Sequence, residues 1–353
     1  MTPTIQAVQL AAVSFPLKKP FVTAQGRKTE THNIQITVRL SDGTLGKAEA
    51  SSSIAMASES QENLRHALQD MIPDLRGEPI ADYKALSAHA WATAPLHPTA
   101  AAAMECALFD AAARHKKVPL ARFIGAKPQS IETDITLSIA PPAELARSTR
   151  EWARKGFRRF KIKLAGGRTA DWERILAVHK AAPRAELVID GNQGFHLQAA
   201  LELTAQIQKA KLPVRFFEQP FPRLDLRSMR QFRKRSAFPL FADESVINTR
   251  DALRVIEAKA VDGINIKLAK CGLTGALDMI PIAQRAGVRL AIGCMEESKL
   301  GLAASVHLAC GTGVFEWIDL DSFLLLDVTA PAGGFRVRGP MYSVSGVRSG
   351  IGL

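Results

Sequence analysis

Cysteine is scarce in this chain of 353 residues, and the four copies are far apart: Cys106, Cys271, Cys294 and Cys310. No two of them form a CxxC pair, so the sequence offers neither a disulfide framework nor the usual spacing of a zinc site. Reduced thiols in a cytosolic protein are the simplest interpretation.

Long apolar runs are also missing. No stretch approaches the ~20 consecutive apolar residues of a membrane span. The N-terminal segment MTPTIQAVQLAAVSFPLKKP has no basic residue ahead of its apolar part, and Gln6 and Gln9 interrupt that part. This pattern fits a β-strand better than a signal peptide, so we expect a cytoplasmic protein that does not bind a membrane.

Acidic residues are outnumbered, with 34 Asp and Glu against 46 Lys and Arg and a net charge of +12. A nucleic-acid partner could explain such a balance. The basic residues are scattered, however, and their densest cluster (154–161) lies where a predicted helix passes into a strand. We therefore expect no nucleic-acid partner, and either a small anionic substrate or solubility accounts for the charge.

From about residue 130, short apolar strands alternate with amphipathic stretches, which predicts βα units and a parallel sheet. Stretches long enough for a helix separate the strands, and no clear helix follows the last one. The pattern predicts a (β/α)7β TIM-like barrel in an α/β protein. Its eight strands are expected at 133–139, 158–164, 185–190, 214–219, 239–244, 261–268, 288–294 and 314–320.

The first 125 residues have another order. Strand-like segments at 4–15 and 32–40 precede Ala-rich helical stretches at 56–73, 82–91 and 98–115. Strands followed by helices indicate an α+β domain. We predict a capping domain (1–125), a catalytic barrel (126–320) and a C-terminal segment (321–353). That last segment has strand-like pieces, FLLLDV and FRVRG, and is expected to pack back on the capping domain.

Active sites of such barrels lie at the carboxyl ends of the strands. Three carboxylates are expected there on successive strands: Asp190, Glu218 and Asp243. Carboxylates so close repel one another unless a cation neutralises them, and hard oxygen ligands suit Mg²⁺. The alternative, that each carboxylate caps a helix or pairs with a lysine, is stronger for one of them alone than for three in register.

Lysines are expected at the same edge. Lys161 and Lys163 share a face of their strand, and Lys267 comes from beyond the carboxylates. A nearby ammonium group, a metal and burial all lower the pKa of a lysine, which makes it a usable base. Two such bases on opposite sides of an α-carbon could invert it. Simple salt bridging and a Schiff-base lysine are the alternatives, and the second leaves the carboxylates unexplained.

Five strings carry a family resemblance: FKIKLAGG, VIDGNQGF, FFEQPF, FADES and NIKLAKCGLTGAL. In this order they resemble the muconate lactonizing branch of the enolase superfamily, and PLKKPFVTA is similar to its capping-domain loop. The resemblance implies that Asp190, Glu218 and Asp243 hold Mg²⁺. It also implies that Lys163 and Lys267 are the acid/base pair, and that Lys161 binds the substrate carboxylate and tunes Lys163. The superfamily is known for such bases acting on an enediolate stabilised by Mg²⁺.

Within that branch, the Asp319-Leu320-Asp321 segment resembles the Asp-x-Asp motif by which dipeptide epimerases hold a free α-ammonium group. Two carboxylates facing one site do form a cation pocket, although a polar strand end would have the same sequence. Thr136 and Cys294 are similar to pocket positions of those epimerases, but ordinary packing explains either residue equally well. In the capping loop, Arg27 and Lys28 are candidates for meeting a glutamate side chain of the substrate, or are exposed to solvent.

The sequence therefore predicts a dipeptide epimerase, of Ala-Glu type, that works as a homo-oligomer. It would invert the α-carbon of the C-terminal residue. An N-acylamino acid racemase or a muconate-type cycloisomerase on the same scaffold is the first alternative, and the two aspartates argue against it. A non-catalytic basic binding protein is the second, and the lysines and carboxylates argue against that.

Overall fold

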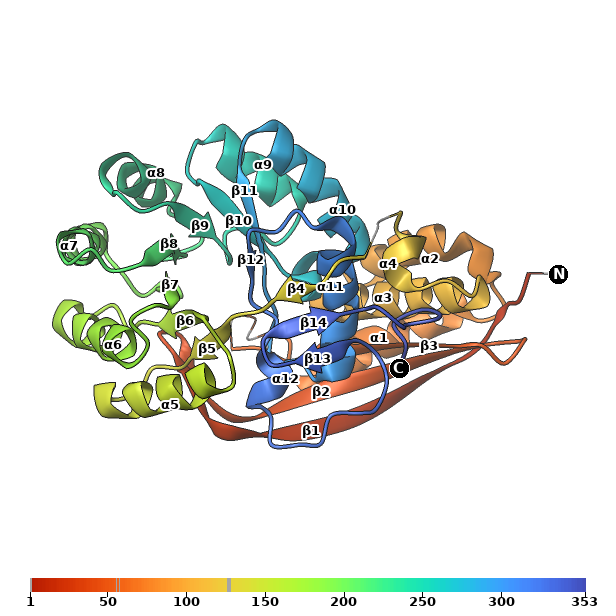
Figure 1. Cartoon of the computed structure of the whole chain (residues 1–353). Helices are drawn as coiled ribbons and strands as arrows, with labels where there is room; N and C mark the ends of the chain where they lie inside the picture. Colours follow the sequence, from red (N-terminus) through yellow and green to blue (C-terminus); the bar gives the residue numbers. More distant parts are fainter. Residues whose placement is uncertain (1, 55, 57, 126–127) are drawn as a thin grey trace.

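A three-stranded antiparallel sheet begins the fold in the computed structural model, which describes residues 2–54, 56, 58–125 and 128–353. Its strands are β1 (Ile5–Thr23), β2 (Gly26–Leu40) and β3 (Leu45–Ser51). The following helices are α1 (Gln61–Leu75), η1 (Ile80–Asp82), α2 (Tyr83–Thr93), α3 (Pro98–His115) and α4 (Leu120–Phe123). Figure 1 shows this α+β layer lying beside the barrel.

Helix α3 packs closely because its side chains are small. It is buried along nearly its whole length, against β3 on one side and a barrel helix, α10 (Leu268–Arg285), on the other. Gly46 of β3 permits the closest approach, since a Cβ there would lie 2.3 Å from the carbonyl oxygen of Ala107. The capping layer and the barrel consequently share one hydrophobic core.

We expect Gly46→Ala to destabilise the protein by about 1–3 kcal/mol, as overpacking of a tight core does. The added methyl group would collide with backbone, which cannot rotate away as a side chain can. Urea denaturation measures the effect. Gly167→Ala is the matched control, because a Cβ at Gly167 meets nothing within 4 Å. Equal free energies of unfolding for the two variants would contradict the close approach.

Eight parallel strands form the second sheet, in the order β12-β11-β10-β9-β8-β7-β6-β5. They are β5 (Ile135–Leu137), β6 (Arg159–Lys163), β7 (Glu186–Asp190), β8 (Val214–Glu218), β9 (Leu240–Ala242), β10 (Gly263–Ile266), β11 (Arg289–Ile292) and β12 (Trp317–Ile318). Besides α10, the helices between them are α5 (Pro142–Arg154), α6 (Arg168–Ala181), α7 (Leu197–Lys209), α8 (Leu226–Arg235), α9 (Thr249–Glu257) and α11 (Lys299–Thr312). The predicted fold class is confirmed.

The two ends of this curled sheet meet where the backbone N–H of Asp134 donates to the carbonyl of Ile318 at 2.9 Å. Large side chains fill the interior. Phe216 and Phe241 stack with ring centroids 3.9 Å apart, and Trp317 contacts Phe216 edge-on. The interior of the barrel is therefore a packed core.

The β1–β2 hairpin reaches over that mouth, as Figure 1 shows. The sequence predicted two shorter strands, but pairing continues to Thr23 and Gly26 after a register shift between Pro16 and Phe21. Pro20 lies in the shifted stretch and has no N–H to donate, which accounts for the break in the ladder. The carbonyl of Val22 accepts a backbone N–H from Ile139 at 3.0 Å, so the hairpin tip is fixed to the barrel.

The C-terminal tail differs from the expectation in one element. FLLLDV was predicted as strand-like, but it contains a helical turn, α12 (Ser322–Leu325). A short apolar run fits either structure, so periodicity alone could not decide. The tail also forms β13 (Arg336–Arg338) and β14 (Met341–Ser343), which pairs with β4 (Ile131–Glu132). Its contacts with the capping layer include a bridge from Leu326 to Leu17.

All four cysteines are free thiols, and only Cys294 is partly exposed. Within the described residues, every helix is too short or too polar to cross a lipid bilayer.

Candidate active site

The carboxyl ends of the strands carry charged residues to one edge of the barrel, because parallel strands all end there. All of these side chains are buried. They are Lys161 and Lys163 in β6, Asp190 ending β7, Glu218 ending β8, Asp243 after β9, Lys267 after β10, and Asp319 and Asp321 after β12.

Strand register sets the first contacts. Lys163 of β6 pairs with Asp190 of β7, and Asp190 in turn pairs with Glu218 of β8. The Nζ atom of Lys163 lies 2.7 Å from Oδ2 of Asp190, and that of Lys161 lies 3.2 Å from the same oxygen. The two lysines therefore point to one side of the strand, as their spacing of two residues requires.

Lys161 connects the carboxylates across the floor of the site. Its Nζ atom lies 2.7 Å from Oε1 of Glu218 and 2.7 Å from Oδ2 of Asp319. Burial alone would lower the pKa of Lys161, but the charges of Asp319, Glu218 and Asp190 raise it well above its ordinary value. Lys161 thus places a positive charge at the floor of the site, between Glu218 and Asp319.

Lys267 enters from the opposite side and lies 2.8 Å from Oδ2 of Asp243. The other oxygen of Asp243 is 2.7 Å from the ammonium group of Lys270. Burial would raise the pKa of Asp243, but Lys267 and Lys270 hold it below its ordinary value. Against the effect of burial, the charge of Asp243 in turn raises the pKa of Lys267.

Carboxylates crowd this end of the pocket. Burial raises the pKa of Glu218 to about 7, and the charges of Asp190 and Asp243 add to the rise while Lys161 opposes it. The pKa of Glu244 rises to about 8, through burial and then through the charges of Asp243 and Asp190. Four buried carboxyl groups that repel one another form an environment that favours a cation.

The residues fit Mg²⁺ by the chemistry of their donors. The carboxylates of Asp190, Glu218 and Asp243 supply hard oxygen ligands. Two nearby buried oxygens, Asn192 Oδ1 and Glu244 Oε2, have no hydrogen-bond partner among the residues that the structure describes. In the described part of the chain, the triad whose ligand atoms lie within 4.8 Å of one another is a different one: Cys294, Asp319 and Asp321. Its thiol is a soft ligand, which suits Mg²⁺ poorly.

Asp319 and Asp321 lie across the pocket from those carboxylates, and both are tied to Thr136 of β5. Oδ1 of Asp319 accepts the Thr136 hydroxyl at 3.2 Å, and Oδ2 of Asp321 accepts the Thr136 backbone N–H at 2.6 Å. Burial, followed by the charge of Asp319, raises the pKa of Asp321 to about 7. An entering cation would relieve that repulsion.

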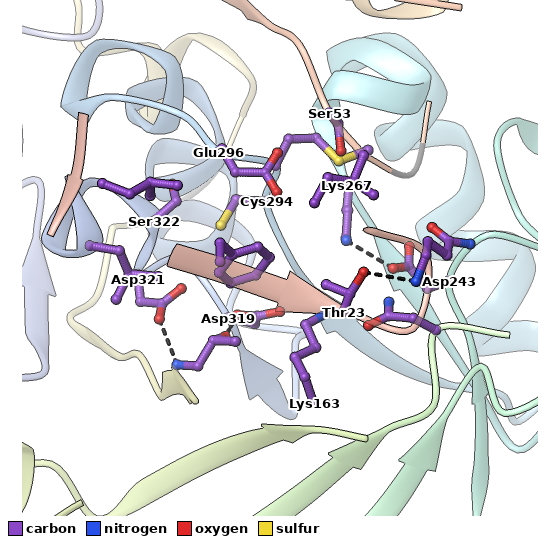
Figure 2. A pocket seen from close by; sticks show the side chains of 18 residues that line it. Thr23, Ser53, Lys163, Asp243, Lys267, Cys294, Glu296, Asp319, Asp321 and Ser322 are labelled. Atoms are coloured by element: carbon purple, nitrogen blue, oxygen red, sulfur yellow. Dashed lines mark hydrogen bonds and ion pairs between the residues drawn. The ribbon is translucent and has the colours of Figure 1, made fainter. Parts of the chain in front are cut away.

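Figure 2 shows the pocket into which these groups point. Lys163 and Lys267 lie on two sides of it, and the hairpin contributes Phe21 and Thr23 to its lining. The lining residues are Leu17, Phe21, Thr23, Gln25, Ser53, Ile54, Thr136, Lys163, Asn192, Asp243, Lys267, Cys294, Met295, Glu296, Asp319, Asp321, Ser322 and Leu325. Most of the predicted site residues thus lie together.

Arg27 is placed elsewhere. Its side chain is exposed, and it does not line the pocket. It pairs across the hairpin with Val22, whereas the lining residues Phe21 and Thr23 belong to the other face. Lys28 pairs with Phe21 and so lies on the face of the hairpin that carries the lining residues. It is not itself a lining residue, and its ammonium group donates to the carbonyl of Ser52 at 2.9 Å.

The sequence reasoning missed several polar residues that support the site. Lys270 contacts Asp243. Asn265 donates to Oε1 of Glu218 at 3.0 Å. Glu296 lines the pocket from the loop after β11. A signal existed for Asn265, since it lies two residues before Lys267 and so shares its face of β10; Glu296 follows the end of its strand, where alternation no longer applies.

Comparison with known proteins places these residues in a family context. Residues 5–125 match the model of the mandelate racemase/muconate lactonizing enzyme N-terminal domain, and residues 144–353 match the enolase C-terminal domain-like model. Together the two models span the capping layer and most of the barrel with its tail.

Individual relatives cover nearly the whole chain. An aromatic dipeptide epimerase from Herpetosiphon aurantiacus is 38% identical over 345 residues, 96% of each chain. An L-Ala-D/L-Glu epimerase from Thermotoga maritima is 32% identical, over 96% of this chain and 97% of its own. A solved structure of a dipeptide epimerase from Methylococcus capsulatus, complexed with Mg and the dipeptide L-Arg-D-Lys, is 32% identical, with a TM-score of 0.92 over 100% of this chain and 99% of its own. The names of these proteins refer to dipeptides with different side chains: aromatic, Ala-Glu and Arg-Lys.

Proposed function

The chain belongs to the mandelate racemase and muconate lactonizing enzyme family of the enolase superfamily, and we propose that it is a dipeptide epimerase that depends on Mg²⁺. It would invert the α-carbon of the C-terminal residue. The observation that carries this proposal is the presence, in one pocket, of two opposed lysines and the Asp319/Asp321 pair.

Asp190, Glu218 and Asp243 are the proposed metal ligands. When bound there, Mg²⁺ would neutralise the carboxylates of the site and would withdraw charge from the substrate carboxylate. Lys161 adds a positive charge beside Asp190 and Glu218, since it lies 3.2 Å and 2.7 Å from their oxygens. That charge orients the substrate carboxylate and makes the adjacent α-proton more acidic.

Lys163 and Lys267 move the proton. They come from β6 and β10, with three strands of the sheet between them, and they approach the pocket from different sides. One amine can take the α-proton from its face of the substrate while the ammonium group of the other returns a proton to the opposite face. Inversion of the α-carbon follows, and the roles exchange for the reverse reaction.

Asp319 and Asp321 would hold the free α-ammonium group of the dipeptide. Both carboxylates are at least 95% buried, with exposed fractions of 5% and 2%, so a cation between them is shielded from water. An N-acylamino acid racemase or a cycloisomerase has no such cation to bind. The two aspartates therefore favour the dipeptide over those substrates.

Removing one aspartate should reveal this role. We expect Asp321→Asn to cost on the order of 2–5 kcal/mol in kcat/KM for an unblocked dipeptide, as for other buried charge pairs. N-acetylation of the dipeptide should cost the wild type a similar amount and cost Asp321→Asn much less, because the partner is already gone. A double-mutant-style cycle with Ala-Glu and N-acetyl-Ala-Glu measures that coupling. If the two losses add, the aspartates do not bind the amino terminus.

N-succinyl amino acids complete the comparison. If kcat/KM is higher for these blocked substrates than for any free dipeptide, the dipeptide assignment fails while the metal and lysine chemistry stands. The preferred side chains, a homo-oligomeric state and a cytoplasmic location are further predictions, and the molar mass in solution tests the second.

A further inference from the structure

One buried charge of the pocket has no part in the chemistry above. Among the charged lining residues, Lys163 and Lys267 move the proton, and Asp243, Asp319 and Asp321 bind the metal or the amino terminus. Glu296 remains. Only 8% of it is exposed, and none of the described residues forms a hydrogen bond with its Oε2 atom. Figure 2 shows its carboxyl oxygens turned toward the pocket, beside Cys294.

The backbone holds Glu296 in this position. Its carbonyl oxygen accepts the side-chain amide of Asn33 at 3.1 Å and the hydroxyl of Ser51 at 2.8 Å. Both donors belong to the capping sheet, in β2 and β3. The carboxylate is therefore presented at the junction of cap and barrel by fixed elements, not by a loose loop.

The charge of Glu296 is only partly compensated. Among the described residues, the cation that pairs with it is Lys28, whose Nζ atom lies 3.8 Å from Oε2, beyond hydrogen-bond distance. Lys28 instead donates to the carbonyl of Ser52 at 2.9 Å. A buried carboxylate without a close partner is costly, so a second cation that reached it would be stabilised. A second carboxylate would be repelled.

The position of Glu296 matches one part of the proposed substrate. The α-carbon of the second residue would lie between Lys163 and Lys267, with its carboxylate toward Asp243 and the amino terminus toward Asp319. The side chain of that second residue would then point toward the capping sheet. There, Ile54 and Met295 offer apolar contacts for methylene groups, and Glu296 is the charged group at the end.

We propose that Glu296 is a specificity-determining residue, and that the preferred substrates are dipeptides with lysine or arginine as the second residue. This inference rests on the proposed dipeptide epimerase function. It also implies discrimination against a second-residue glutamate, whose carboxylate would face Glu296. Of the two residues expected to meet a substrate glutamate, Arg27 is exposed outside the pocket, and Lys28 donates to the carbonyl of Ser52.

Three dipeptides test the proposal: Ala-Lys, Ala-norleucine and Ala-Glu. Norleucine has the length of lysine without the charge, so the ratio of kcat/KM for Ala-Lys to that for Ala-norleucine isolates the contribution of charge. We expect wild-type protein with Mg²⁺ to favour Ala-Lys by about 10- to 100-fold, the usual range for a charge-assisted hydrogen bond. Glu296→Gln should bring the ratio near one and raise the relative rate for Ala-Glu.

Two further variants complete the experiment, one as a second test of Glu296 and one as a control. Lys28→Met removes the only nearby competitor for Glu296 among the described residues and should increase the Ala-Lys preference. Glu30→Gln deletes a charge from an exposed side chain of the same hairpin and should leave the ratio unchanged. Lys28→Met gives a result even where Glu296→Gln fails to fold, because it leaves the carboxylate in place.

The outcomes separate this inference from the proposed function. If no dipeptide is epimerised, the proposed function fails. If dipeptides are epimerised but Ala-norleucine or Ala-Glu equals Ala-Lys in the wild type, the role of Glu296 is wrong and the function stands. A ratio that Glu296→Gln leaves unchanged also overturns the inference, and so does a charge preference found for Lys-Ala but not for Ala-Lys.

Discussion

In Lys267→Ala, exchange of the substrate α-proton with solvent should stop for one epimer of a dipeptide and survive for the other. Lys163→Ala should show the reverse selectivity. Epimerisation needs both lysines, so it should fall in each variant on the order of 10²–10⁴-fold, the usual contribution of a general acid or base. Proton NMR in D₂O with each separate epimer measures both quantities.

The reason lies in the arrangement of the two amines. Each ammonium group is held by a carboxylate of its own, Lys163 by Asp190 at 2.7 Å and Lys267 by Asp243 at 2.8 Å, so neither can swing across to do the other's work. Lys180→Ala, on the exposed side of α6, is the control for loss of a lysine. Normal epimerisation by Lys267→Ala would make that lysine structural and refute the two-base scheme.

Loss of a metal ligand should be the most severe change. Asp190→Asn, Glu218→Gln and Asp243→Asn each remove a negative charge from the proposed Mg²⁺ site, and we expect turnover to fall below detection in all three. EDTA treatment of the wild type should have the same effect, and added Mg²⁺ should reverse it. Calorimetric titration with Mg²⁺ should show weaker binding in each variant.

A control variant shows whether loss of any carboxylate would have the same effect. Glu202→Gln removes a carboxylate from an exposed position on α7, and it should change neither turnover nor the affinity for Mg²⁺. Full activity of the EDTA-treated, metal-free protein would show that the three carboxylates serve another purpose, such as pairing with the lysines that contact them.

The sequence predicted the barrel and the charged residues at its mouth because both depend on local, periodic features. A strand end and the alternation of Lys161 with Lys163 can be read from a few adjacent residues. The neighbours of Asp243 could not be predicted in this way, because Lys270 reaches Asp243 from the first turn of α10, beyond the end of the strand. Such contacts depend on the path of the chain after the strand has ended.

The capping loop illustrates the same limit. Arg27 and Lys28 are adjacent in sequence, and only the register of the hairpin decides that Lys28 faces inward while Arg27 faces solvent. A register shift between Pro16 and Phe21 sets that outcome, and sequence periodicity does not locate it. Neither Arg27 nor Lys28 lines the pocket, whereas Glu296, which pattern reasoning had no cause to select, does.

The most direct test of the central claim is incubation of the wild type with Mg²⁺ and a library of free dipeptides in D₂O, followed by mass spectrometry. A dipeptide epimerase that returns a solvent proton to the α-carbon should add one deuterium to that carbon of the C-terminal residue, and chiral analysis should find it inverted. We expect both changes in unblocked dipeptides. Deuterium uptake only by N-acylated amino acids, or by no member of the library, would contradict the account.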